Sequence, residues 1–370
     1  MQFYGAPNGG LPIAGVGKST SHDGTSAYST RHEEESRYPF VAYHHQNMDI
    51  DALPAPITTA DAPFDDLADN ADLVIRTDDN VDFFVLSALL SLGSPSSFFH
   101  QVLQGNKHTE ERDGLPVLRV EEDSDTFRDI LLFCYPYATP KIGSIEQFME
   151  VGMALNKYCM DLATERFIQT VLVSSVISEQ PFRVFALAVA NGWKEIGEAA
   201  ARNTLSMPLN QVVSDIEELG VISARHRYRL QDYHVRCGKA AQIRAGMGVS
   251  LPWLDQKTSG LTFLRRDSVC PWCCSGIRFV AYGDSGERLY SHGWLVDTYF
   301  QLVNAKLLLE PWPQVALDDH IIDQTIVASN KQCGAHWNSI AGSQILRLGK
   351  IVAEEIDRRI SKSSPQCRVE

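Results

Sequence analysis

The hydrophobic pattern is most regular between residues 71 and 135, where short apolar runs alternate with turn residues. Residues 72–76 alternate apolar and polar side chains, which predicts a half-buried strand. Residues 78–80 read Asp-Asp-Asn and supply turn chemistry, and the apolar run 81–85 returns as a second strand. Two strands around such a turn predict a β-hairpin.

The same stretch continues with alternating helices and a further strand. Residues 86–92 predict an apolar helix, which Ser94-Pro95 ends while starting another. Residues 115–120 predict a third strand. Ser124, between two aspartates, opens a helix because acidic and hydroxyl side chains favour a helix start. Its apolar face carries Phe127, Ile130, Leu131 and Cys134.

Helical spacing dominates the rest of the chain. Residues 145–161 predict one helix, residues 181–205 predict two helices separated by Gly192, and residues 223–237 predict a further one. From residue 246 onward the composition changes. This last region holds five of the six tryptophans and the cysteine cluster, and it predicts helices at residues 293–309 and 339–361.

Residues 1–69 show no sustained periodicity and are rich in Gly, Ser, Thr, Pro, Asp, Tyr and His. Such a segment buries too little apolar surface to offset its ordering entropy, which predicts a disordered N-terminal tail. The prolines near its end predict a semi-extended linker into the first strand.

The order of elements resembles the BTB/POZ fold, an α/β interaction module. The resemblance is carried by the Ala-Asp-Leu-Val-Ile opening, the step from strand to helix at residues 83–90, and Ser94-Pro95 with Phe98-Phe99. It also includes the helix end Leu-Leu-Phe-Cys-Tyr-Pro at residues 131–136 and the Asn-Lys-Tyr-Cys-Met run at residues 156–160. The Asp-Gly-Leu-Pro-Val and Phe-Cys-Tyr-Pro segments resemble the divergent subfamily abundant in basidiomycete fungi.

The resemblance implies an α+β protein with four parts. Residues 1–69 form the tail, and residues 70–175 form the BTB/POZ domain. Residues 176–245 resemble a BACK helical extension, and residues 246–370 form a mostly helical C-terminal domain with a Cys/His cluster. A repeat of 40–50 residues is missing from the sequence, so no kelch propeller is expected.

The same resemblance implies that the chain binds proteins. BTB relatives form homo-oligomers, or recruit a cullin scaffold for ubiquitin ligation through a face that corresponds here to residues 96–102 and 130–135. We therefore predict Phe98, Phe99 and Tyr135 as partner-interface residues, although buried packing of at least two of them is an alternative. Many BTB domains carry a His-Lys pair where this chain has Leu86-Ser87, which puts repressor recruitment in doubt.

Composition narrows the function classes. The chain has 370 residues, enough for two or three domains, and 44% of them are hydrophobic, which suits globular cores. Its net charge of −13 argues against a broad nucleic-acid surface. No apolar run is long enough for a membrane helix, and no secretion signal is recognisable. Eight unevenly placed cysteines do not form a secreted disulfide framework, so cytoplasm or nucleus is expected.

The strongest candidate for chemistry is a metal site formed by Cys270, Cys273, Cys333 and His336. Two C-x2-C or C-x2-H half-sites have the spacing of a tetrahedral zinc site, and Gly334 favours a knuckle turn. Cys274, His292 and His320 are further potential donors. Two alternatives remain open: buried structural thiols, and a redox Cys-Pro-Trp-Cys motif that would need a βαβ unit.

The leading hypothesis is therefore that the chain is a non-catalytic interaction protein. It predicts no cofactor beyond the structural zinc that the Cys/His cluster could bind. The alternative is a zinc-containing regulatory protein whose C-terminal domain binds nucleic acid or a second partner. A third class, a nucleotide-binding enzyme, would rest on Gly17-Lys18-Ser19. That motif has Pro12 where a phosphate-binding loop needs glycine, and neither a hydrophobic strand nor a helix surrounds it.

Overall fold

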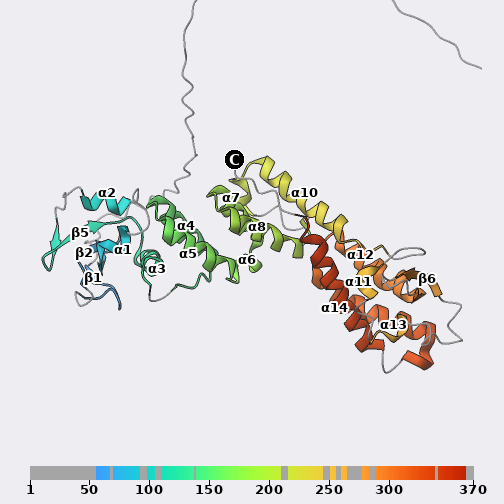
Figure 1. Ribbon diagram of the computed structural model, residues 1–370. Helices are drawn as coiled ribbons and strands as arrows, with labels where there is room; N and C mark the ends of the chain where they lie inside the picture. Colours follow the sequence, from blue (N-terminus) through green and yellow to red (C-terminus); the bar gives the residue numbers. More distant parts are fainter. Residues whose placement is uncertain are drawn as a thin grey trace, which may run out of the picture. The chain divides into compact units, whose positions relative to one another are not determined.

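The chain divides into two units, Met1–Leu53 and Pro54–Glu370, and the described residues all belong to the second. The computed structural model (Figure 1) describes residues 56–66, 70–91, 98–104, 110–136, 139–209, 216–244, 251–255, 260–264, 277–282, 288–337 and 341–363. The predicted disorder of the tail falls, up to residue 55, outside the described residues.

A five-stranded sheet forms the first part of the described chain, coloured blue to teal in Figure 1. Its strands are β1 (Thr58–Thr59), β2 (Leu73–Arg76), β3 (Val81–Val85), β4 (Glu111–Arg112) and β5 (Leu115–Arg119), in the order β1-β3-β2-β5-β4. The predicted hairpin is confirmed: β2 and β3 pair antiparallel around Asn80, whose φ is 60°. The β2–β5 and β1–β3 pairs are parallel.

The domain begins earlier than the predicted boundary at residue 70. Strand β1 lies within the stretch predicted as tail, and Phe64 is fully buried against the rings of Phe83 and Tyr135. A two-residue strand next to prolines leaves almost no periodicity in the sequence. The sheet partner that stabilises β1 is far along the chain, so local pattern could not reveal it.

Five helices complete this domain, and the capping residues explain where two of them start. They are α1 (Ser87–Ser91), α2 (Phe98–Gln104), α3 (Ser124–Cys134), α4 (Ile145–Lys157) and α5 (Asp161–Leu172). Asp123 caps α3 by accepting a hydrogen bond from the Thr126 N–H at 2.8 Å. Ser144 caps α4 by accepting from the Gln147 N–H at 3.1 Å. Both caps satisfy backbone donors that the helix itself leaves unpaired.

Strand β2 is buried on both faces, which corrects the prediction of a half-buried strand. Leu73 and Ile75 belong to the main core, whereas Val74 joins a smaller cluster with Phe84 and Val117. Alternate residues of a strand point to opposite faces of the sheet, so the second face is covered too. The polar position that suggested exposure, Arg76, is itself only 2% exposed.

Arg76 is buried because acidic partners satisfy its guanidinium. Its Nε and Nη2 atoms donate to the two carboxylate oxygens of Asp82 at 2.6 and 2.9 Å, and Nη1 donates to Glu110. Arg112 reaches across the Phe84 ring to Asp82 and to the Thr59 hydroxyl. A bidentate arginine–carboxylate pair with further hydrogen bonds is the arrangement that a buried charge requires.

The following helices share a core with the BTB-like part. They are α6 (Val176–Glu179), α7 (Pro181–Ala190), α8 (Lys194–Asn203) and α10 (Ala224–Ala241), with 3-10 turns η1 (Thr204–Ser206) and η2 (Glu217–Gly220). Trp193, just before α8, packs against Phe148 of α4 and Phe167 of α5, with ring centroids 5.3 and 5.5 Å apart. The predicted boundary near residue 175 therefore does not separate two cores.

The C-terminal region is mostly helical, as predicted, but contains an antiparallel pair of strands. Its elements are α11 (Pro252–Asp255), η3 (Thr262–Leu264), β6 (Ile277–Tyr282), β7 (Arg288–His292), π-helical η6 (Leu295–Phe300), α12 (Gln301–Leu307), η7 (Pro313–Leu317), α13 (Asp319–Trp337) and α14 (Ala341–Ile360). The helices predicted at 293–309 and 339–361 are confirmed, whereas α13 and the β6–β7 pair were missed. None of the helices in the described ranges is long and apolar enough to cross a membrane.

Candidate protein-interaction surface

Of the three predicted interface residues, Phe98 alone is exposed, at 38%. It lies at the start of α2, and its ring packs against Tyr158 and Phe99 with centroid distances of 5.3 and 5.4 Å. Its backbone N–H donates to the Tyr158 carbonyl at 3.2 Å. These contacts fix the position of the Phe98 ring, which stays partly exposed.

Phe99 and Tyr135 belong to the core, so they cannot present side chains to a partner in this conformation. Phe99 is fully buried between Tyr158 and Phe127, with ring centroids 5.0 and 6.4 Å away. Tyr135 is 8% exposed, stacks edge-on against Phe64, and accepts a hydrogen bond from the Leu86 N–H at 2.8 Å. The structure therefore favours the predicted alternative of buried packing for these two residues.

The α3 part of the predicted cullin-type face is also mostly internal. Ile130, Leu131 and Phe133 are buried, whereas Leu132 and Cys134 are partly exposed. Arg166 of α5 closes the end of the helix by donating to the carbonyls of Phe133 and Tyr135 at 2.6 and 2.9 Å. The apolar residues predicted to form a contact face are therefore mainly core residues.

A charged cluster borders Phe98 through Tyr158. Lys157 lies over the Tyr158 ring and donates to Glu121 and Glu122, both at 2.8 Å. The Tyr158 hydroxyl donates to Glu122. Burial together with the Glu122 carboxylate raises the pKa of Tyr158, while the hydrogen bond from Lys157 lowers the pKa of Glu121. An exposed aromatic ring beside fixed charges is an anchor-and-rim arrangement typical of protein interfaces.

The step between β3 and α1 carries Leu86-Ser87, and Ser87 is bound to Asp72, the residue just before β2. The Ser87 N–H donates to Asp72 Oδ1 at 2.6 Å, and the Ser87 hydroxyl donates to Asp72 Oδ2 at 2.7 Å. Ser87 therefore donates hydrogen bonds to both carboxylate oxygens of Asp72. Among the described residues, no basic side chain forms a hydrogen bond or ion pair with Asp72.

The predicted metal ligands are only partly within the described residues. Cys270 and Cys273 lie outside them. Cys333 and His336 belong to α13, so the backbone there is helical and the predicted knuckle turn at Gly334 is wrong. Their spacing of three still places them on neighbouring turns of one helix face. In the described ranges, no group of three or more His, Cys, Asp or Glu residues is arranged to hold a metal.

A small mixed sheet, a buried aromatic core and the partly exposed Phe98 define a domain of the α+β class. Comparison with protein families agrees: residues 64–172 match the BTB/POZ domain, from the buried Phe64 to the end of α5. BTB/POZ domains are protein-interaction modules that are typically non-catalytic and commonly form homo-oligomers. No curated protein matches the chain.

Proposed function

We propose that this chain is a non-catalytic BTB protein that self-associates or recruits a partner through the surface around Phe98. The single observation that supports this assignment is the exposed ring of Phe98, which is positioned by Tyr158 within a domain whose other large aromatics are mostly buried. An aromatic residue held in place before binding loses little conformational entropy when a partner covers it.

In the recruitment form of this proposal, the partner is a cullin scaffold and the chain is a ubiquitin-ligase adaptor. Helices α6 to α10 would then be a BACK-like extension that carries the C-terminal region. Support comes from the continuous packing of Trp193 against α4 and α5, which ties the extension to the BTB domain. This role would place the protein in the cytoplasm or nucleus. We also propose that the chain belongs to the divergent fungal subfamily of BTB proteins.

The experiment uses the full-length chain with Phe98→Asp, and Val173→Asp as the matched control. Val173 is 86% exposed at the end of α5, so both variants add one carboxylate at an exposed apolar position. Light scattering coupled to size-exclusion chromatography measures self-association, and pull-down with purified cullin measures recruitment. We expect Phe98→Asp to lose at least one of these, while Val173→Asp keeps both.

If Phe98→Asp retains both the oligomeric state and cullin capture of the unmodified chain, the surface is not the interface. Thermal unfolding of both variants verifies that neither substitution disrupts the fold. Phe99→Asp serves as a third comparison, because a carboxylate at this fully buried position is expected to destabilise the domain instead.

A second candidate is a zinc-containing regulatory protein, with Cys270, Cys273, Cys333 and His336 as ligands. It is supported by the placement of Cys333 and His336 three residues apart in one helix. The C-terminal region would then bind nucleic acid or a second partner. Elemental analysis of the full-length protein, and of Cys333→Ser with His336→Ala, measures zinc content. A stoichiometry near zero in the unmodified chain rejects this candidate.

A further inference from the structure

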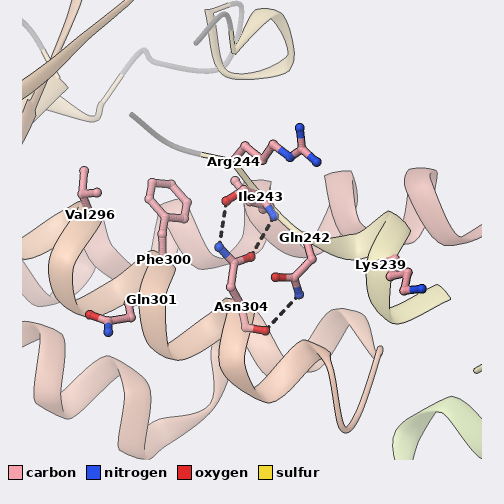
Figure 2. Close-up of a pocket in the computed structure, with 8 residues that line it drawn as sticks. All are labelled: Lys239, Gln242, Ile243, Arg244, Val296, Phe300, Gln301 and Asn304. Carbon is pink, nitrogen blue, oxygen red and sulfur yellow. Dashed lines mark hydrogen bonds between the residues drawn. The ribbon is translucent and has the colours of Figure 1, made fainter. Parts of the chain in front are cut away.

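A pocket of about 570 Å³ lies where α10 ends against η6 and α12 (Figure 2). Two cations, Lys239 and Arg244, line it together with three primary amides, Gln242, Gln301 and Asn304. Val296 and Phe300 add an apolar wall. Among the described residues, none that lines the pocket is acidic, and no carboxylate forms an ion pair with Lys239 or Arg244.

The pocket wall is held in place before any ligand arrives. The Ile243 N–H donates to Asn304 Oδ1, and Asn304 Nδ2 donates back to the Ile243 carbonyl, both at 2.8 Å. Gln242 Nε2 donates to the Asn304 carbonyl at 2.9 Å. Figure 2 shows these three bonds joining the end of α10 to α12, while Lys239 and Arg244 extend away from Asn304. A preorganised wall reduces the entropy lost on binding.

Helix α10, which ends at the pocket, is basic, whereas the chain as a whole is acidic. It contains five basic residues and one acidic residue, whereas the whole chain has a net charge of −13. The acidic residue, Asp232, is engaged with Arg236 at 2.8 Å. Arg227 and Lys239 are exposed, and neither forms an ion pair within the described part of the chain. A local positive field of this kind attracts acidic ligands and orients them.

The same face of α10 also exposes apolar side chains. Tyr228 is 68% exposed and Val235 is 44% exposed, and their spacing of seven places them on one side of the helix. Leu308, which is 56% exposed, follows α12, and its backbone lies against Gly238 of α10. Exposed apolar residues bordered by charges mark a binding surface for a protein.

We propose that the α10 surface, from Tyr228 to the pocket at Lys239 and Arg244, binds an acidic amphipathic segment of a protein partner. Carboxylates of that segment would pair with Lys239 and Arg244, and its apolar residues would contact Val235 and the partly exposed Val296. The exposed valine and leucine favour a protein over nucleic acid, because phosphates gain nothing from aliphatic contacts and the acidic chain repels them. This surface is separate from the one around Phe98.

The test measures fluorescence anisotropy with the full-length chain at low ionic strength, where surface charge is least screened. The probe is a labelled helical peptide of about 15 residues built from glutamate and leucine at amphipathic spacing. Its counterparts are the same peptide with lysine in place of glutamate, and a DNA duplex. We expect the glutamate peptide to bind best, and the Kd to rise with added salt.

The decisive variant is Lys239→Glu with Arg244→Glu, and its matched control is Lys331→Glu with Lys350→Glu. All four positions are exposed, and both double variants change the net charge equally. We expect the pocket variant to weaken glutamate-peptide binding about tenfold or more, and the control to change it little. Equal losses in both variants, no preference over the lysine peptide, or tighter binding of DNA would each overturn the proposal. Phe98→Asp is expected to bind the peptide normally.

Discussion

The indole ring of Trp193 occupies the space that a side chain at position 152 would need. A Cβ atom built on Gly152 overlaps the Trp193 ring and comes within 3.0 Å of Phe167. Trp193 is only 4% exposed, and its Nε1 donates to Asn156 Oδ1 at 3.3 Å. Because residue 152 of α4 is a glycine, the helical extension can pack directly against the BTB domain.

Gly152→Ala is expected to destabilise the chain even though alanine has the higher helix propensity. Overpacking of this kind costs about 1–3 kcal/mol in the free energy of unfolding. Gly143→Ala is the control, because a Cβ there meets nothing within 4 Å. In a Trp193→Leu background the Gly152→Ala penalty is expected to shrink, as measured by urea denaturation in a double-mutant cycle. An equal penalty in both backgrounds would show that the indole is not the cause.

The buried pair of Arg76 and Asp82 predicts a large effect from a small substitution. Asp82 is fully buried, and Asp82→Asn removes the charge that compensates the Arg76 guanidinium. Breaking one half of such a buried pair costs about 3–5 kcal/mol. Glu111→Gln, at an exposed position of β4 at the edge of the same sheet, is the matched control and is expected to change stability little. Similar unfolding midpoints for the two variants would contradict this account.

The same pair predicts how stability depends on pH. Burial by itself favours the protonated form of Asp82, but hydrogen bonds from Arg76 and Arg112 hold its pKa below the usual value. A carboxyl group with a lowered folded-state pKa stabilises the protein above the unfolded pKa of about 3.9 and loses this contribution as the pH falls. Unfolding midpoints measured between neutral pH and pH of about 3 are expected to converge for the unmodified chain and Asp82→Asn. A gap that stays constant over this range would exclude the effect.

Local patterns predicted the domain well where each element has its own signal. The β2–β3 hairpin follows from alternation around Asn80, and α3 follows from acidic capping and an apolar face. The burial of Arg76 could not be read locally, because its partners Asp82 and Glu110 come from other segments. An arginine in an alternating strand has the same sequence signature whether it is solvated or paired.

Local sequence patterns were equally unable to predict which candidate-site residues are exposed. Aromatic spacing identified Phe98, Phe99 and Tyr135 together, yet whether a ring faces a partner or the core depends on the helix that packs over it. The basic residues of α10 can be recognised in the sequence, but their spacing alone does not show which part of the fold they border. The hydrogen bonds of Asn304 with Ile243 and Gln242 join the end of α10 to the pocket, and these contacts span about sixty positions of the chain.

Cysteine reactivity gives an independent measure of the Phe98 surface. Cys159 is exposed and directly follows Tyr158, whose ring contacts Phe98. Burial raises the pKa of Cys134 to about 12, and it also raises that of Cys237, which is fully buried. Because the thiolate is the reactive form, alkylation at pH of about 8 is expected to modify Cys159 at least tenfold faster than either of the others.

Peptide mapping by mass spectrometry separates these three sites from the remaining cysteines, and alkylation in denaturant shows that all three react once unfolded. A partner that covers Phe98 also reduces access to Cys159, so its alkylation is expected to slow on self-association or on cullin binding. Phe98→Asp is expected to abolish that protection while Val173→Asp preserves it. Protection that persists in Phe98→Asp would place the partner on another surface, because the thiol would then be shielded without the aromatic anchor.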